Sequence, residues 1–462
     1  MNQSSTLFAL VGFLLLGLAV PADAQHQHQH RKKTNMRLFW VDQSTQKLTW
    51  GDVVTTDKWA LNTSTVDGFP EMDSKANRLS PLVGRNGMVV AGISGTADDK
   101  KKGRWVAIDS GVYQEPHGNH FHWKYTGRPT VTQTINEERQ GRASRVSFVG
   151  EQLYLLGDKG FSTDNLNNLR IRGAATGTRK FFPATNWPVS QSTFVDNVVG
   201  YSAWDDSDGE HAGQVDVIKL ADSTKPAYSF KLPSGDVSVT TFNSDKVFFA
   251  HKDTISWVTP DRSCSLGSDN VKVNQVNPAN QDLKLESPPA TFVNERNWVT
   301  FTTGTGESSK LCMIDAASPT PTVIALPIKV NEGLQLSAPK TILSLGKRYA
   351  FIFHQRIKPA GEGATDDIKE QLTIVELDPN RDMRFDDARI AKTIPVGKSL
   401  IKDDAGHHQV SFDAYGRFAV FTNPGDGTLS VMTMQDLQVR VNFKVDGVPT
   451  QIVAVGAPEH FH

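Results

Sequence analysis

Three histidines within six residues are the most specific chemical feature of the sequence. They are His117, His120 and His122 in the run His-Gly-Asn-His-Phe-His. In an extended chain, residues i and i+2 point to the same face, so His120 and His122 are expected to converge. Gly118 allows the backbone to turn and would bring His117 towards them. Imidazole is a favoured ligand of tetrahedral zinc. The run therefore predicts a metal site, and the alternative is a solvated loop.

A second pair, His407-His408, follows Gly406 late in the chain. Adjacent side chains of an extended segment face opposite ways, so at most one of the two is expected to reach a shared metal. His408 is our preferred ligand, although the spacing leaves both open. The other interpretation is that one ring packs and the other is exposed. A single site would require folding to bring this pair to the loop at 117–122.

Further histidines lie at the two ends of the chain. Those at the N-terminal end alternate with glutamine and are His26, His28 and His30. The surrounding segment, residues 25–34, lacks an apolar pattern that could order it, so we predict a disordered tail. Its imidazoles are predicted to capture Zn²⁺ or Cu²⁺ transiently, and the alternative is a solvating spacer. His460 and His462 are expected to form an exposed tail, and the alternative is that they capture metal in the same way as the N-terminal histidines.

The isolated histidines give a weaker signal. His211 follows an acidic loop that lacks the spacing of an EF-hand, which favours a solvated turn over a Ca²⁺ site. His251 and His354 each follow an apolar strand and are expected to be structural. Asp413 is expected to form a turn within its hairpin.

Common catalytic motifs are absent from the sequence. It contains no Gly-x-Ser-x-Gly elbow, no P-loop, no His-Glu-x-x-His helix and no Cys-x-x-Cys-His haem site. Neither Cys264 nor Cys312 has a histidine nearby in the sequence, which disfavours a blue-copper site. The two thiols could pair in an oxidising compartment.

The start of the chain has the pattern of a signal peptide. The apolar run from Leu7 to Val20 is too short to span a bilayer, which needs ~20 residues. The small residues Ala22 and Ala24 follow it, and we predict cleavage after Ala24 and a periplasmic or secreted protein. The whole chain has 49 Lys and Arg against 50 Asp and Glu, so charge gives no reason to expect nucleic acid as a partner. No later stretch approaches membrane length.

The elements that must position these histidines are predicted to be short strands. An apolar strand, a tight turn and a second strand recur at intervals of about 50 residues, which is typical of a β-propeller. The all-β fold is predicted to be one ring over residues 35–462 with seven visible blades. The extra strand Met36–Val41 is expected to pair into the last blade and close the circle, or to start an eighth blade. An array of β-sandwiches is the alternative fold.

Taken together, these features resemble the periplasmic zinc metallochaperones of the AztD type. The resemblance rests on an exported propeller, a His-rich mature N-terminus, the His-x-x-His-x-His loop at 117–122 and the Gly-His-His segment at 406–408. It implies a protein that binds Zn(II) and passes it to the solute-binding protein of a zinc ABC importer. The short tail departs from the family because it has glutamine, not acidic residues, between its histidines.

The leading hypothesis is therefore a non-enzymatic zinc carrier, expected to be a monomer without membrane insertion. Acid is expected to release the metal, because a protonated imidazole cannot coordinate. One alternative is a metal-dependent propeller hydrolase or lyase. The other is an interaction propeller without metal, in which the histidines are incidental.

Overall fold

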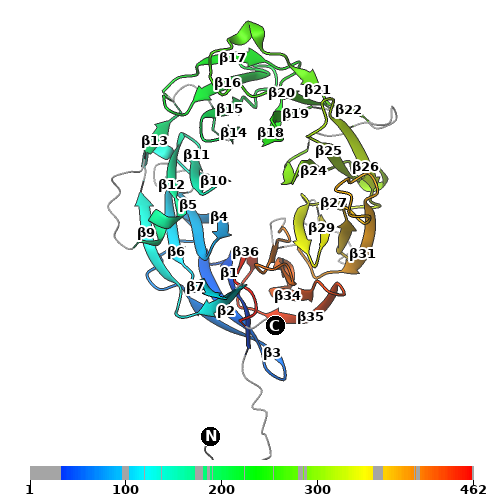
Figure 1. The fold of residues 1–462 in the computed structure, drawn as a ribbon. Helices are drawn as coiled ribbons and strands as arrows, with labels where there is room; N and C mark the ends of the chain where they lie inside the picture. Colours follow the sequence, from blue (N-terminus) through cyan, green and yellow to red (C-terminus); the bar gives the residue numbers. More distant parts are fainter. Residues whose placement is uncertain are drawn as a thin grey trace, which may run out of the picture.

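In the computed structural model, the described part of the chain forms a ring of eight sheets (Figure 1). The structure describes residues 33–95, 103–118, 120–136, 138–171, 180–184, 188–189, 191–222, 224–252, 254–278, 285, 289–356, 368–399, 401 and 406–459. The β-propeller prediction is confirmed, and the ring has eight blades, the larger of the two numbers allowed by the sequence.

The first four blades, each given from its innermost strand outwards, have the following bounds. Blade 1 contains β36 (Pro449–Val455), β1 (Lys33–Asp42), β2 (Lys47–Thr55) and β3 (Trp59–Thr65). Blade 2 contains β4 (Asn77–Arg85), β5 (Met88–Gly95), β6 (Arg104–Asp109) and β9 (Thr130–Asn136). Blade 3 contains β10 (Ala143–Val149), β11 (Gln152–Gly157), β12 (Gly160–Asn165) and β13 (Lys180–Pro183). Blade 4 contains β14 (Ser192–Val195), β15 (Val199–Ala203), β16 (Gln214–Lys219) and β17 (Tyr228–Lys231).

The other four blades follow the same order. Blade 5 contains β18 (Val237–Asn243), β19 (Lys246–His251), β20 (Thr254–Val258) and β21 (Asn274–Gln275). Blade 6 contains β23 (Val293–Glu295), β24 (Trp298–Thr303), β25 (Lys310–Asp315) and β26 (Thr322–Pro327), with β22 (Asn277–Pro278) along its edge. Blade 7 contains β27 (Leu334–Leu336) and β28 (Lys340–Ser344), which share the partner β29 (Lys347–Arg356), then β30 (Gln371–Glu376) and β31 (Arg389–Pro395). Blade 8 contains β32 (Val410–Phe412), β33 (Phe418–Asn423), β34 (Thr428–Thr433) and β35 (Gln438–Lys444).

A few elements lie outside the blades. The hairpin of β7 (Val112–His117) and β8 (His120–Tyr125) is inserted between β6 and β9. A helix, α1 (Leu166–Arg170), follows β12. Single 3₁₀ turns are Glu138–Gln140, Ser268–Asn270, Gly306–Ser308 and Pro424–Asp426. No helix in the described ranges is long and apolar enough to cross a membrane.

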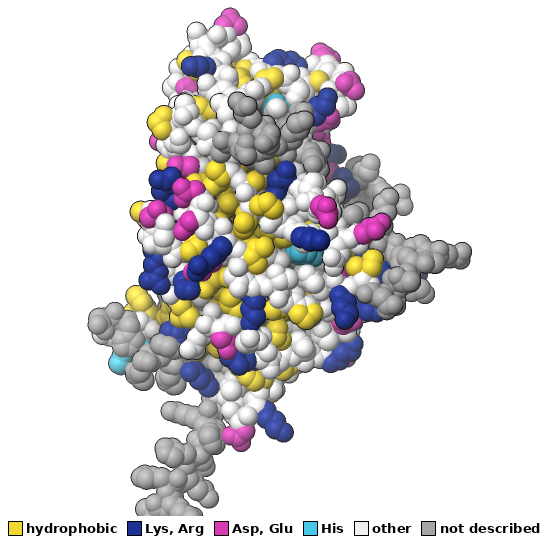
Figure 2. Space-filling view, turned by 90° about the vertical axis from the view of Figure 1, so that its right-hand side faces the viewer, with side chains coloured by type: hydrophobic (Ala, Val, Ile, Leu, Met, Phe, Trp, Pro, Cys, Tyr) yellow, Lys and Arg dark blue, Asp and Glu magenta, His cyan; other side chains and the backbone are white. Residues whose placement is uncertain are grey.

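The hydrophobic core is divided among the interfaces between blades. Strand side chains alternate between the two faces of a sheet, and both faces of each blade are covered by a neighbour. In β1, Leu38 and Trp40 pack against blade 8, whereas Phe39 and Val41 pack towards blade 2. Each blade is therefore apolar on both faces. The side of the molecule shown in Figure 2 also carries basic and acidic side chains, which lie around an apolar area.

The two ends of the described chain close the ring. β1 pairs antiparallel with β36, for example at Arg37 and Val455, and Figure 1 shows these strands, blue and red, side by side. This confirms the closing role predicted for Met36–Val41. The segment also begins a blade of its own, which is why the blades number eight. β1 starts at Lys33, so the last two residues of the tail predicted at 25–34 belong to this strand.

Candidate metal site

The hairpin β7–β8 places the first histidine group on one face. Its register pairs His117 with His120 and Glu115 with His122. Directly paired residues of an antiparallel ladder lie on the same face, as do residues two apart along a strand. All four residues therefore share one face of the hairpin. Gly118 has a φ of 61°, which a two-residue turn requires, as the sequence had led us to expect.

Two of these imidazoles are close neighbours in space. The ring centroids of His117 and His122 are 4.8 Å apart, and the rings are inclined at 80°. The Nδ1 atom of His122 lies 3.4 Å from the carbonyl oxygen of Glu459. A carbonyl can only accept, so this contact favours the tautomer that keeps a lone pair on Nε2. Among the described side chains, which do not include that of His120, no three His, Cys, Asp or Glu groups are near enough to hold a metal.

A buried arginine fixes the base of the hairpin. The guanidinium of Arg37 in β1 donates to the carbonyls of Ser110 (2.5 Å) and Gly127 (2.6 Å), which flank the inserted hairpin. Its Nε donates to Asp52 at 2.7 Å. Charge-assisted bonds of this kind are stronger than neutral ones. Arg37 is thus a positioning residue that the sequence did not single out, because a basic residue in a strand has no distinctive motif.

The aromatic residues of β8 attach the hairpin to blades 1 and 8. Trp123 is buried in the core between blades 1 and 2. The hydroxyl of Tyr125 donates to Ala457 O at 2.9 Å. Burial, followed by nearby carboxylates, raises the pKa of Tyr125, so it stays a donor. Tyr415 packs edge-on against Trp123 with centroids 6.2 Å apart.

Both ends of the described chain meet beside His122. Glu459 donates its backbone N–H to Thr34 O at 3.2 Å, and its carboxylate accepts from Thr34 N at 3.3 Å. Glu459 is the residue whose carbonyl lies next to His122. The predicted signal peptide at 1–24 lies outside the described residues, as do the predicted capture residues His26, His28 and His30.

His408 is enclosed by hydrogen bonds in the core between blades 7 and 8. Its side chain is fully buried, its Nδ1 donates to Thr422 O at 2.7 Å, and its Nε2 lies 3.0 Å from a carboxylate oxygen of Glu370. The ring stacks on Phe353 with centroids 4.9 Å apart. Burial raises the pKa of Glu370, but the hydrogen bonds from His408 and Ser399 lower it by more, so it lies below its usual value. Both nitrogens of His408 are therefore already occupied.

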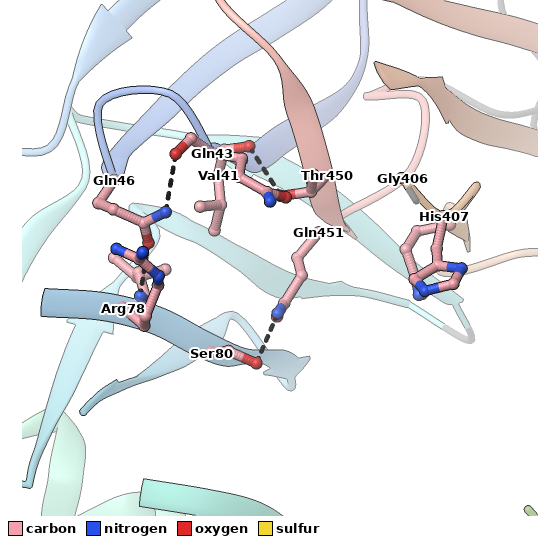
Figure 3. Close-up of a pocket in the computed structure, with 11 residues that line it drawn as sticks. Val41, Gln43, Gln46, Arg78, Ser80, Gly406, His407, Thr450 and Gln451 are labelled. Atoms are coloured by element: carbon pink, nitrogen blue, oxygen red, sulfur yellow. Dashed lines mark hydrogen bonds between the residues drawn. The ribbon is translucent and has the colours of Figure 1, made fainter. Parts of the chain in front are cut away.

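His407 faces the other way and is exposed, as alternation along the strand predicts. Its Nδ1 accepts a hydrogen bond from Gln355 Nε2 at 2.9 Å. It lines a cavity of about 410 Å³, in which Arg78 stands at the opposite side (Figure 3). Gly406 precedes it because a Cβ there would lie 1.9 Å from the carbonyl of Ser399.

The structure does not bring the pair 407–408 to the hairpin. Tyr415, in the turn after β32, contacts the hairpin, and its hydroxyl donates to Phe121 O at 3.4 Å. His408 lies before β32, at the other end of the same strand. At a rise of ~3.3 Å per residue, His408 and Asp413 are roughly 17 Å apart. The predicted single coordination sphere of 117, 120, 122 and 408 is thus divided between opposite ends of blade 8.

The isolated histidines have structural partners. His211 stacks on Trp204 with centroids 3.9 Å apart, so it is packed rather than fully solvated. His251 is buried, and its Nε2 is 2.7 Å from the hydroxyl of Ser256. His354 is buried beside Thr373 at 2.8 Å. The structural role predicted for His251 and His354 is confirmed.

Asp413 forms the turn that supports Tyr415. Its Oδ1 accepts from the backbone N–H groups of Arg417 and Phe418, each at 2.6 Å. Burial raises the pKa of Asp413 to about 6, although the backbone hydrogen bonds act in the opposite direction. Its predicted role as a turn former is confirmed.

The two cysteines are free thiols. Cys312 lies in the core between blades 5 and 6, whereas Cys264 packs against the core between blades 4 and 5. Burial raises the pKa of Cys264, and that of Cys312 to about 12, so neither is an activated thiolate. The suggested pairing of the two is therefore not present.

Comparison with known proteins adds evidence on the fold. No protein-family model and no curated protein matches the sequence. Among solved structures, apo AztD from Citrobacter koseri matches with a TM-score of 0.59 and 15% identity, over 93% of this chain and 100% of that one. A second structure of Citrobacter koseri AztD matches with a TM-score of 0.56 over the same shares and at the same identity. The chain has the fold of AztD. At this identity the likeness concerns the fold, and the function must be argued from the site.

Proposed function

We propose that the protein is an exported zinc carrier, which holds Zn(II) on the β7–β8 hairpin and delivers it to the solute-binding protein of a zinc ABC importer. The observation that carries this proposal is the hairpin register, which puts His117, His120, His122 and Glu115 on one face. Three imidazoles and a carboxylate form a donor set that zinc accepts.

The position of the hairpin suits a carrier. His117 is exposed and His122 half-buried, so an acceptor protein can approach the metal and replace its ligands one at a time. Glu115 forms an exposed ion pair with Lys124 at 3.2 Å. Such pairs contribute little, about 0–1 kcal/mol, so Glu115 can exchange Lys124 for the metal at low cost.

The chain ends support a capture role for the tail. Thr34 lies next to Glu459 and so next to His122. Three residues of extended chain span about 11 Å, so a tail that leaves the fold at Lys33 can carry His30 to the hairpin. We propose that His26, His28 and His30 collect zinc and pass it to the hairpin. His460 directly follows Glu459 in the sequence and is a further candidate ligand.

The proposal of a zinc-transport partner rests on the resemblance to AztD-type metallochaperones described from the sequence. Export is proposed from the signal-peptide pattern at residues 1–24. His407 and His408 are not proposed as ligands of the hairpin site, because they lie at the other end of blade 8.

The test is a competitive zinc titration of the chain from residue 25 onwards. The variant His117→Ala/His122→Ala should bind zinc at least about 100-fold more weakly, because it lacks two of the three imidazoles. The matched control is His211→Ala/His407→Ala, which also removes two histidines and should keep the affinity of the unmodified chain. Equal affinity in the hairpin variant and the unmodified chain would rule out the site.

The role of the tail is tested separately. Deletion of residues 25–32 should leave the equilibrium affinity of the hairpin unchanged and slow the loading of zinc from a dilute chelator. If the deletion abolishes tight binding altogether, the tail and not the hairpin holds the metal.

A further inference from the structure

A second cavity, separate from the hairpin, lies where blades 6, 7 and 8 meet. It has a volume of about 290 Å³, and its polar lining residues are Thr291, Ser337, Lys340, Gln355, His407, His408 and Gln409. His407 and Gln409 also line the cavity shown in Figure 3, so the two cavities adjoin.

The cavity exists because the inner strand of blade 7 is interrupted. β27 and β28 both pair with β29, and Pro339 lies between them and has no N–H to donate. The Ser337 hydroxyl instead accepts the N–H of Phe353 at 2.9 Å. The chain thus leaves the regular ladder and re-enters it at Lys340, the first residue of β28.

Lys340 is a cation without a partner in the cavity wall. Within the described chain it makes no hydrogen bond or ion pair, and the described lining of the cavity contains no Asp or Glu. Lys340 is exposed at the edge of the cavity, so its ammonium group can reach a ligand that enters from solvent. An anion in the cavity would be attracted to this unpaired positive charge.

Gln355 and His407 add an acceptor and a donor. Gln355 is 5% exposed, and its Oε1 has no hydrogen-bond partner in the described chain. A buried carbonyl left without a donor is costly, which favours a ligand that supplies one. Gln355 Nε2 donates to Nδ1 of His407, so a neutral His407 ring carries its hydrogen on Nε2.

The remainder of the wall is apolar. Phe351 and Phe353 of β29, together with Val293 and Val410, provide apolar lining. At ~30 Å³ per water molecule, the volume corresponds to about ten waters. A ligand of about ten non-hydrogen atoms with a short hydrocarbon part therefore fits.

We infer that this cavity binds a small α-hydroxy carboxylic acid. The carboxylate pairs with Lys340 and accepts from His407, the hydroxyl donates to Gln355 Oε1, and the hydrocarbon part lies on the two phenylalanines. An α-amino acid fits less well, since its ammonium would add a second cation beside Lys340. The same lysine opposes a divalent metal at His407.

The experiment is calorimetric titration of metal-free protein, in buffer with a chelator, with 2-hydroxy-4-methylpentanoate. Two close analogues serve as comparators: 4-methylpentanoate lacks the hydroxyl, and leucine has an ammonium in its place. The hydroxy acid should bind at least about tenfold more tightly than either one.

Variants connect the binding to the cavity. Lys340→Met should weaken binding of the hydroxy acid about ten- to hundredfold, and Lys340→Arg should restore most of it. Lys58→Met, in the turn between β2 and β3, is the control and should change nothing. If Lys340→Met does not fold, Gln355→Met replaces it, and this variant should also bind the hydroxy acid more weakly.

Any one of these results would overturn the inference: no binding at about 10 mM ligand, equal affinity in Lys340→Met, or either comparator binding as tightly as the hydroxy acid. Because the titration contains no zinc, its outcome is independent of the proposed zinc site.

Discussion

The two histidine segments at opposite ends of blade 8 look alike in the sequence and differ in the structure. At the hairpin, His117 and His122 lie side by side at the surface, and their register partners are His120 and Glu115. At the other end, His408 is enclosed, with both ring nitrogens satisfied by Thr422 and Glu370. The comparison shows that clustering of histidines does not distinguish ligands from core residues. The polar groups that surround each ring do.

The two histidine segments also differ in the charge of the side chains near them. A carboxylate shares the hairpin face with the histidines, which favours a cation. The cavity beside His407 contains Lys340 and no described acid, which favours an anion. The two histidine segments thus have charged neighbours of opposite sign, Glu115 beside His122 and Lys340 in the cavity that His407 lines.

The largest expected difference between the two ends is in stability. His408→Ala leaves the carboxylate of Glu370 buried without its partner and opens a cavity, so it should lower the free energy of unfolding by about 3–5 kcal/mol. His407→Ala removes an exposed ring and should cost less than about 1 kcal/mol. Urea unfolding measures both. A loss in His407→Ala as large as that in His408→Ala would remove the contrast.

Acid should weaken the His408 end selectively. The pKa of Glu370 lies below its ordinary value of 4.5, so its ionised form stabilises the fold above that pH. This contribution is lost as the pH falls through the pKa of the folded state. Asp413 acts with the opposite sign, since its raised pKa, about 6, makes its contribution grow as the pH falls from 6 towards 3.8.

The comparison that isolates Glu370 is therefore urea unfolding of the unmodified chain and of Glu370→Gln at pH 7 and pH 4. The stability difference between them should shrink at pH 4. A difference that stays constant would show that the carboxylate is not ionised in the fold.

A smaller effect is expected at the anchor of the hairpin. Tyr125→Phe removes the hydrogen bond to Ala457 O, which should cost about 0.5–1.5 kcal/mol. Zinc affinity should fall by less than the loss in His117→Ala/His122→Ala, because the register of β7 and β8 is retained. Tyr113→Phe, on the exposed side of β7, is the matched control for both measurements.

Much of the architecture could be predicted because the inner hairpin of each blade repeats. In each repeat a tight turn, such as the one at Gly150, joins two apolar strands. This pattern revealed seven units in the sequence. Blade 1, which was not among these seven, takes its inner strand, β36, from the far end of the chain, so no contiguous repeat marks it. The face shared by His120 and His122 also followed from alternation along a strand.

The separation of the two histidine segments could have been predicted from the sequence only if the position of the β7–β8 hairpin within its blade had been known. In a four-stranded antiparallel blade, the first strand starts at one end, and the loop between the third and fourth strands lies at the opposite end. The hairpin is inserted in this loop of blade 2. His408 lies just before the first strand of blade 8, at the opposite end of the ring. The partnership of His408 with Glu370 could not be predicted, because no local pattern links the two.

The pairing of β1 with β36 also sets a condition on how the molecule is made. The outer strands of blade 1 are produced first and its inner strand last. During synthesis or export, blade 1 has only the three strands β1, β2 and β3 until the C-terminal segment with β36 emerges. Closure of the ring is thus the last step, and a polypeptide shortened before Pro449 would leave the edge of β1 open to other chains.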